Sequence, residues 1–310
     1  MLCTDIIVQV CDYLDNSNNY YLNKYIHQSV QDSEKGLYWK HKYDSFFKNM
    51  NKTYLILNGN YNWKKEYIRI KNINYWHRIE NSQKLELNSG SINKIPKEIG
   101  NLNNLEELNF SDNKIKEIPI EISNLNNLKK LNLSSNKIKK IPIEIGNLNN
   151  LRTLILKYNE LGEIPKEIGY LNNLIELNFF SNKIINIPTE IGNLNNLEEL
   201  NFSNNKIINI PTEIGNLVNL KYLFSSGNQI EEIPIEIGNL INLEMLHFDF
   251  NKIKIIPKEI GNLHNLEELY LNNNKIENIP KEMDNLRNLH AMYLHNNCMQ
   301  NMYWYVCQKK

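Results

Sequence analysis

The sequence of 310 residues has little of what several large protein classes require. Its four cysteines lie in pairs at the two ends of the chain, at Cys3, Cys11, Cys298 and Cys307. Secreted domains that depend on disulfides use cysteines more densely, so we expect reduced thiols and a cytoplasmic protein. No apolar run approaches the length of a membrane span, and residues 1–15 lack the basic leader of a signal peptide. We therefore expect an intracellular protein without a membrane-spanning segment.

The chain also lacks an excess of charge of either sign, since 35 Lys and Arg residues face 35 Asp and Glu residues. This balance argues against binding to nucleic acid or to a membrane surface. There is no nucleophile elbow, phosphate loop or paired zinc motif, so we expect no enzyme, no catalytic residue and no cofactor. His290, His295 and Cys298 are close in sequence, but three ligands at irregular spacing do not predict a metal site.

Proline is scarce and confined to one place in a repeating unit of 23 residues, LxxLxLxxNxIxxIPxEIGNLxN. Complete copies begin at Leu105 and recur to Leu266, a degenerate first copy begins at Ser82, and a truncated last copy begins at Leu289. We number the positions of the unit 1 to 23 from its first leucine. A period of 23 falls within the range of leucine-rich repeats, whose units bury their apolar faces only by stacking. The sequence thus predicts an α/β solenoid, a horseshoe with a parallel inner sheet.

Each part of the unit has a structural interpretation. The leucines at positions 4 and 6 alternate as in a short strand with one buried face. The asparagine at position 9 is flanked by apolar residues, so we expect a buried amide that bonds the backbone of the neighbouring repeat. Gly90 takes its place in the first copy. The segment IPxEIG predicts a short helical or 3-10 turn with Ile122 and Leu125 facing inward, which the glycine allows to end early.

Three regions follow from this pattern. Residues 1–81 contain no repeat and no proline, and their apolar residues recur at helical spacing, so we expect a small all-α domain. Residues 82–297 form nine repeats and a partial tenth. Residues 298–310 are rich in aromatics and are expected to cap the last turn.

The first region resembles an F-box in three segments. Residues 2–15 are similar to the opening pattern LPxELLxxIFxYLD, residues 37–40 to an LWK segment, and residues 63–67 to a WKxxY element. Cys3 stands where that family has proline. The resemblance implies a Skp-type adaptor as partner and a role as substrate receptor of a cullin-RING ubiquitin ligase. It assigns adaptor binding to Leu2, Ile6, Ile7, Val10, Tyr13, Leu14 and Trp39.

Two other interpretations remain open. The first region is also what a helical cap of a solenoid would look like, because every solenoid must cover its open ends. The repeats IPxEIGNLxNL resemble those of Ras-group leucine-rich repeat proteins, which implies a stand-alone scaffold or regulator with a small GTPase or a phosphatase as partner. In either case we expect a monomer that binds protein, and no nucleic acid or membrane.

Residues that the repeat does not dictate suggest where a partner binds. Positions 3, 5, 7 and 8 are expected on the concave face, and position 5 changes from asparagine to aromatic residues and histidine in the later copies. Neighbouring strands lie about 4.8 Å apart, so these side chains would be contiguous. Exposed rings on a rigid sheet are typical of binding hot spots, although drift at an outward-facing position is the alternative. The predicted partner site comprises Phe180, Tyr222, Phe224, Met245, His247, Phe250, Tyr270 and Tyr293.

Overall fold

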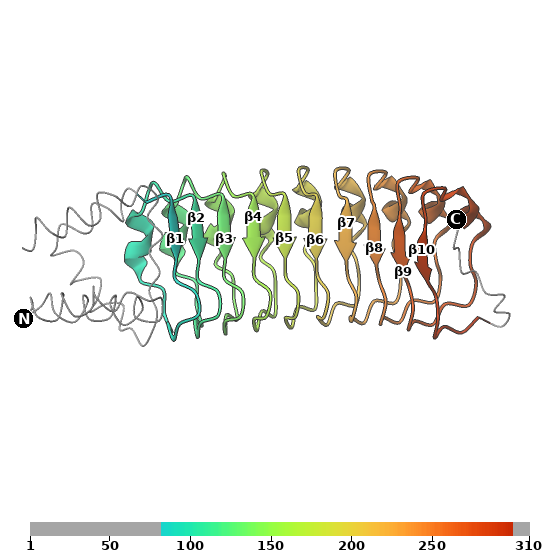
Figure 1. The fold of residues 1–310 in the computed structure, drawn as a ribbon, viewed down its shortest axis with the longest axis horizontal. Coiled ribbons are helices and arrows are strands. Elements are labelled where there is room, and N and C mark those ends of the chain that lie inside the picture. Colours follow the sequence, from blue (N-terminus) through green and yellow to red (C-terminus); the bar gives the residue numbers. More distant parts are fainter. Residues whose placement is uncertain (1–81, 300–310) are drawn as a thin grey trace, which may run out of the picture.

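The structure is a computed structural model, and it describes residues 82–299. Ten short parallel strands stand side by side in chain order in one sheet, as Figure 1 shows from the first strand (teal) to the last (dark red). They are β1 (Lys84–Glu86), β2 (Glu107–Asn109), β3 (Lys130–Asn132), β4 (Thr153–Ile155), β5 (Glu176–Asn178), β6 (Glu199–Asn201), β7 (Tyr222–Phe224), β8 (Met245–His247), β9 (Glu268–Tyr270) and β10 (Ala291–Tyr293). The predicted parallel-sheet solenoid is confirmed.

A 3-10 turn follows each of the first nine strands and returns the chain to the next one. These turns are η1 (Lys97–Asn101), η2 (Ile120–Asn124), η3 (Ile143–Asn147), η4 (Lys166–Tyr170), η5 (Thr189–Asn193), η6 (Thr212–Asn216), η7 (Ile235–Asn239), η8 (Lys258–Asn262) and η9 (Lys281–Asn285). The proline of each unit directly precedes the turn in extended conformation, where its missing N–H is not needed. Ile122 and Leu125 are fully buried, as predicted.

The core runs without interruption through the stack. Buried residues at positions 1, 4, 6, 11, 14, 18 and 21 of successive copies form one hydrophobic cluster. Position 6 holds Leu or Phe in nine of the ten copies, and Phe179 stacks on Phe202 with ring centroids 5.9 Å apart. The seventh copy has Ser225 instead, whose fully buried hydroxyl has no hydrogen-bond partner among the described residues. One copy therefore carries a defect in an otherwise apolar column.

The glycine at position 19 has a different role from the one predicted. It lies inside the 3-10 turn, as Gly192 does in η5, and its φ is not positive, so it does not end the turn by a left-handed conformation. A Cβ at Gly192 would lie 2.5 Å from the carbonyl oxygen of Glu213 in the next copy. The turn does end one residue after the glycine, at Asn193, but the glycine's role in the structure is to let successive turns pack closely.

The asparagine at position 9 forms the predicted ladder. In a representative copy, the Nδ2 group of Asn136 donates to the carbonyl oxygens of Phe110 in the previous copy and Leu133 in its own, at 2.9 and 3.1 Å. Its Oδ1 atom accepts from the backbone N–H of Ile115, at 2.9 Å. The same set recurs from Asn113 to Asn297, so each copy completes the backbone hydrogen bonding of the copy before it.

A second asparagine ladder runs along the exposed side of the stack, at position 23. The Nδ2 group of Asn196 donates to the carbonyl oxygen of Asn172 at 2.7 Å, and that of Asn242 donates to Val218 at 2.8 Å. The acceptor is always the backbone of position 22 in the previous copy, so the side chain at position 22 is free to vary. Sequence analysis missed this ladder.

Candidate functional site

The exposed face of the sheet, called the sheet face below, is built from positions 3 and 5 of each copy. The leucine between them, for example Leu223 in β7, points into the core and is fully buried. Strand alternation therefore turns its neighbours Tyr222 and Phe224 outward. Parallel register places each outward residue beside its equivalent in the next copy, as Phe224 lies opposite His247. The sheet face is thus two parallel columns of side chains across ten strands.

Four side chains at position 5 form a contiguous ring column, made of Phe224, His247, Tyr270 and Tyr293. Phe224 meets His247 edge to face at 4.9 Å between ring centroids. His247 lies 4.1 Å from Tyr270, and Tyr270 stacks on Tyr293 at 4.5 Å. Three of the rings are partly buried against each other, while Tyr293 is exposed. The structure thus brings these predicted residues together.

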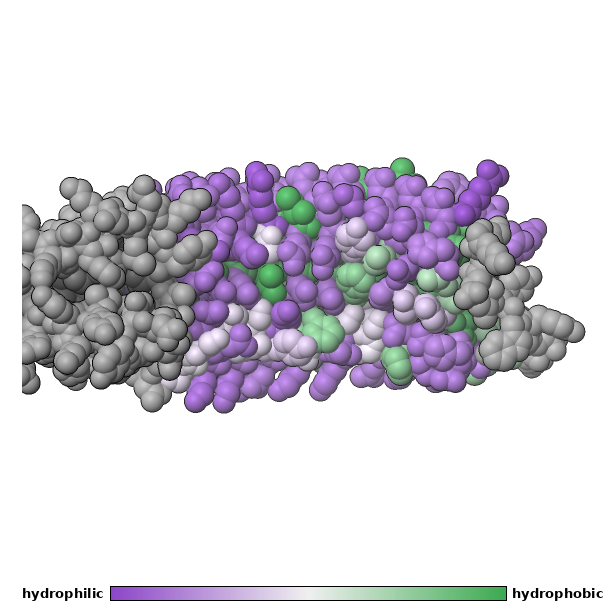
Figure 2. Space-filling model, viewed as in Figure 1, coloured by the Kyte–Doolittle hydropathy of each residue, from purple (hydrophilic) through white to green (hydrophobic). Residues whose placement is uncertain are grey.

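The other four predicted residues divide into two groups. Tyr222 and Met245 occupy position 3 beside the ring column, and Tyr222 stacks parallel to Phe224 at 6.5 Å. Phe180 instead meets Tyr158 edge to face at 5.2 Å. Phe250 is 58% exposed in the turn after β8, and within residues 82–299 no ring contact joins it to the column. Figure 2 shows hydrophobic side chains (green) set among hydrophilic ones over the middle and C-terminal strands.

Tyr158 was missed by sequence analysis, although a signal was present. Position 8 adopts a left-handed conformation in every copy, with φ between 53° and 67°. Most copies have Ser, Asp, Asn or Gly there, but the fourth and the eighth have Tyr158 and Phe250, at φ of 56° and 55°. A bulky residue with positive φ is uncommon and marks strain or function. Both rings are exposed, so burial does not explain them.

His247 has an electrostatic environment that favours its neutral form. Burial lowers its pKa below the ordinary value of 6.5, and the carboxylates of Asp249 and Glu268 only partly offset this effect. Its Nε2 atom is buried without a hydrogen-bond partner among the described residues, 3.8 Å from Glu268. Burial also raises the pKa of Tyr270 to about 12. At neutral pH the ring column is therefore uncharged.

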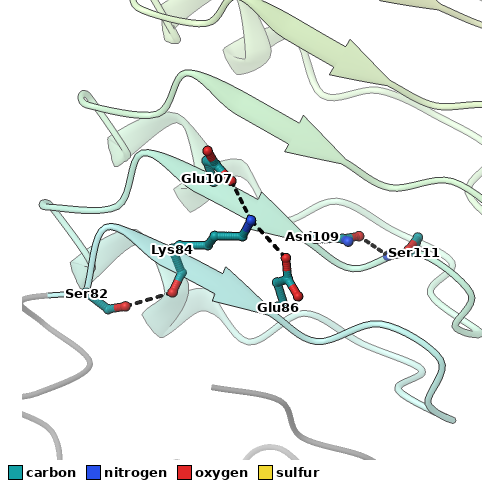
Figure 3. Close-up of polar contacts among 6 residues, drawn as sticks. All are labelled: Ser82, Lys84, Glu86, Glu107, Asn109 and Ser111. Carbon is teal, nitrogen blue, oxygen red and sulfur yellow. Dashed lines mark hydrogen bonds and ion pairs between the residues drawn. The ribbon is translucent and has the colours of Figure 1, made fainter. Parts of the chain in front are cut away.

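The N-terminal end of the sheet face is polar and internally satisfied (Figure 3). Lys84 lies 3.0 Å from Glu86 and 2.9 Å from Glu107, and hydrogen bonds to these carboxylates, that to Glu107 above all, raise the pKa of its ammonium group. In position 5, the Oδ1 atom of Asn109 accepts from the backbone N–H of Ser111 at 2.9 Å. These side chains already have partners within the fold.

The C-terminal half of the sheet face differs in charge. Its position 3 column begins with Glu176 and Glu199, which lie opposite each other in adjacent strands. Burial, and then the charge of Glu176, raises the pKa of Glu199. Glu268 follows in β9 and Asp249 lies after β8. From β5 to β10, positions 3 and 5 contain three carboxylates and no Lys or Arg, and Asp249 at position 7 adds a fourth carboxylate beside them. No ion pair to Lys or Arg satisfies these carboxylates within residues 82–299.

Some predicted features lie outside the described residues. The adaptor-binding residues and the all-α domain fall in 1–81, and most of the predicted C-terminal cap falls in 300–310. Between residues 82 and 299, no helix is long and apolar enough to cross a bilayer. The same part of the chain contains no group of three or more His, Cys, Asp or Glu side chains placed to hold a metal ion.

Several solved structures are similar to this chain. The crystal structure of a TDR receptor is 26% identical, with a TM-score of 0.67, and the match covers 82% of this chain and 48% of that one. The structure of the Arabidopsis receptor kinase HAESA with the peptide hormone IDA and the co-receptor SERK1 is 29% identical, with a TM-score of 0.64, covering 70% and 38%. Internalin C2 from Listeria monocytogenes is 30% identical, with a TM-score of 0.57, covering 64% and 84%. The match thus spans less than half of each receptor chain.

No protein with a curated function matches the sequence. Two family models do match it. Residues 120–207 and 200–304 match the model described as a leucine-rich repeat region, and residues 81–138 match that described as a leucine rich repeat. These matches agree with the parallel sheet and the asparagine ladder, and together they assign the chain to one family. The chain belongs to the leucine-rich repeat family, whose fold serves as a protein-protein interaction module.

Proposed function

We propose that the C-terminal half of the sheet face, β5 to β10, is the surface that binds the protein partner. The observation that carries this proposal is the ring column of Phe224, His247, Tyr270 and Tyr293, held in contact at 4.1–4.9 Å. Rings fixed against each other lose little side-chain freedom on binding, and aromatic residues dominate the energy of protein interfaces. The structure of HAESA, a similar receptor, was solved with a bound peptide hormone, which supports recognition of protein segments by this fold.

Drift of outward-facing residues is the competing explanation, and the position of the rings argues against it. Random replacement would scatter aromatic residues along position 5, but the first six copies have none and the last four have three rings and a histidine. Tyr222 and Met245 extend the same cluster in position 3 of the same strands. The apolar side chains thus gather on one continuous part of the sheet face, as a contact surface requires.

A matched pair of variants tests this proposal. The full chain with Phe224, Tyr270 and Tyr293 changed to Ala should lose the proteins that the wild type captures from a cell extract, as quantified by mass spectrometry. The control changes Asn109, Asn132 and Ile155 to Ala, which are three residues of the same column in the first half. Both variants should remain folded by circular dichroism. Equal loss of capture in the two variants would contradict the proposal.

We further propose that residues 1–81 connect this binding module to a Skp-type adaptor, so that the protein acts as an intracellular substrate receptor of a cullin-RING ubiquitin ligase. Support comes from the F-box-like segments of residues 2–15, 37–40 and 63–67 alone. The full chain should then capture a purified adaptor, and Ile6→Asp with Ile7→Asp should abolish the complex, whereas Gln9→Asp in the same segment should not. If the wild type does not bind the adaptor at micromolar concentrations, the alternative of a stand-alone scaffold takes its place.

A further inference from the structure

The chemistry of the sheet face also indicates what kind of segment it binds. The inference rests on the proposed binding function of β5 to β10 and concerns the charge of the partner. We propose that the partner presents an extended basic segment, whose Arg or Lys side chains lie over the ring column and meet the carboxylates of Glu176, Glu199 and Glu268.

The first argument is the unbalanced charge of position 3. In the N-terminal strands this column alternates in sign, because Lys84 lies opposite Glu107 and Glu107 lies opposite Lys130. In β5 and β6 two carboxylates, Glu176 and Glu199, lie opposite each other instead. Like charges in direct register are unfavourable. A cation from outside the described fold would remove this repulsion, as Lys84 does for Glu86 and Glu107.

The second argument is the combination of rings and carboxylates on adjacent strands. Glu199 lies opposite Tyr222, Tyr222 opposite Met245, and Met245 opposite Glu268, so carboxylates flank the apolar pair in one column. The ring column runs parallel to them, two residues further along each strand. A guanidinium or ammonium group within about 6 Å of an aromatic face is attracted to it, and a nearby carboxylate adds to that attraction.

The neighbouring side chains sharpen the charge preference. Lys221 is the cation nearest to this region in sequence, and it is engaged by Glu198 at 2.8 Å. Glu244 accepts a hydrogen bond from the hydroxyl of Tyr222 at 2.9 Å, which fixes that ring beside the column. Because no Lys or Arg of this chain occupies positions 3, 5, 7 or 8 from β5 to β10, an acidic partner would find no cation of these positions to pair with and would be repelled by the carboxylates. The charge of the face therefore complements a basic segment and opposes an acidic one.

The dimensions favour an extended segment that crosses the strands. Four strand intervals separate β5 from β9, which is about 19 Å at a strand spacing of about 4.8 Å. An extended chain advances about 3.3 Å per residue, so roughly six residues cover this distance. Such a segment can place a cation near Glu199 and another near Glu268, with apolar side chains on Tyr222 and Met245 between them.

Selection from a random 12-residue peptide library on the immobilised full chain tests the inference. Peptides retained by the wild type should be enriched in Arg and Lys. A synthetic version of the most enriched peptide should bind the Glu176→Gln, Glu199→Gln, Glu268→Gln variant about tenfold more weakly, with a smaller salt dependence. The control removes three carboxylates in or directly beside the first two strands, by Glu86→Gln, Glu106→Gln and Glu107→Gln, and should bind as the wild type does.

The possible outcomes separate this inference from the proposed function. Retained peptides that need the rings but carry no excess of Arg and Lys would overturn the basic-segment inference and leave the ring column as a binding surface. Equal weakening by the two glutamine variants would also overturn it, since the effect would then reflect net charge alone. Peptides retained equally by the variant with Phe224, Tyr270 and Tyr293 changed to Ala would overturn both. A dimer of the wild type that this variant abolishes, seen by light scattering, would assign the surface to a second copy of the chain instead.

Discussion

The two halves of the sheet face have the same backbone and opposite surface chemistry. In β1 and β2 the outward side chains are satisfied internally, as with Lys84 between two glutamates and Asn109 bonded to the backbone of Ser111. In β5 to β10 the same positions hold rings that contact one another and carboxylates that have no Lys or Arg partner among the described residues. The comparison shows that the repeat determines the backbone and the core, whereas the outward side chains can vary without changing either.

The largest predicted change in stability tests whether the asparagine ladder contributes equally in both halves of the stack. Asn136→Leu and Asn251→Leu each remove a buried amide that bonds three backbone carbonyls, and each should lower the free energy of unfolding by about 1–3 kcal/mol. Chemical denaturation measures both. The exposed neighbours Lys137→Ala and Lys252→Ala should change stability by less than about 0.5 kcal/mol. A large difference between the two leucine variants would show that the halves differ in more than their surfaces.

The second effect concerns the one defect found in the core of the C-terminal half. Ser225→Ala removes a fully buried hydroxyl that lacks a partner, so it should raise the free energy of unfolding by about 1 kcal/mol. Thermal melting of the full chain measures this change. In the first half, Leu133→Ala at the same position should lower stability by about 2–5 kcal/mol. A loss of stability in Ser225→Ala would indicate that its hydroxyl is bonded in solution.

The third prediction concerns replacement of a position 3 glutamate by glutamine. The resulting change in folding stability should be smaller, and its sign should differ between the two halves. Glu199→Gln removes repulsion from Glu176 and should stabilise the fold by about 0.2–1 kcal/mol. Glu107→Gln removes a partner of Lys84 and should destabilise it by no more than about 1 kcal/mol. Denaturation at low and at high salt measures both changes, which screening should reduce. Changes of the same sign would contradict the proposed difference in charge balance.

The smallest effect is a pH dependence of stability that arises from His247 in the ring column. The folded chain holds the pKa of His247 below 6.5, so its contribution to stability is present above pH 6.5 and is lost as the pH falls through the lowered pKa. Nuclear magnetic resonance of the histidine ring protons should place the midpoint of His247 below that of the same residue in urea. The His247→Gln variant should show a flatter dependence of stability on pH. A midpoint equal to or above the urea value would contradict burial as the dominant cause.

The repeated features of the fold were predictable because the residue pattern of each one recurs in successive 23-residue copies. The strand, the 3-10 turn and the position 9 amide follow from apolar spacing and from the need to satisfy a buried side chain. The second ladder was equally predictable in principle, since position 23 is Asn in every complete copy while position 22 changes at Val218 and Ile241. What the sequence did not reveal was its acceptor, a backbone carbonyl whose position depends on how the copies stack.

The site was predictable in part for the same reason. Residues at positions 3 and 5 share a register with their equivalents, so the contacts of His247 and Tyr270 follow from the period alone. Positions 7 and 8 lie where the backbone leaves the sheet and turns through a left-handed residue, and spacing does not determine where those side chains point. Phe180 therefore meets Tyr158 instead of the ring column, and Phe250 stands apart in its turn.

The two asparagine ladders also bear on how such a protein changes in evolution. Both ladders bond each copy to the one before it, and all complete copies offer the same donors and acceptors. Duplication or deletion of a whole 23-residue unit therefore leaves no backbone group without its bond, whereas any other length would interrupt both ladders. A gene can lengthen the stack one unit at a time, and each new unit adds one outward residue to position 3 and one to position 5 of the sheet face. The length of the proposed binding surface thus changes in steps of about 4.8 Å.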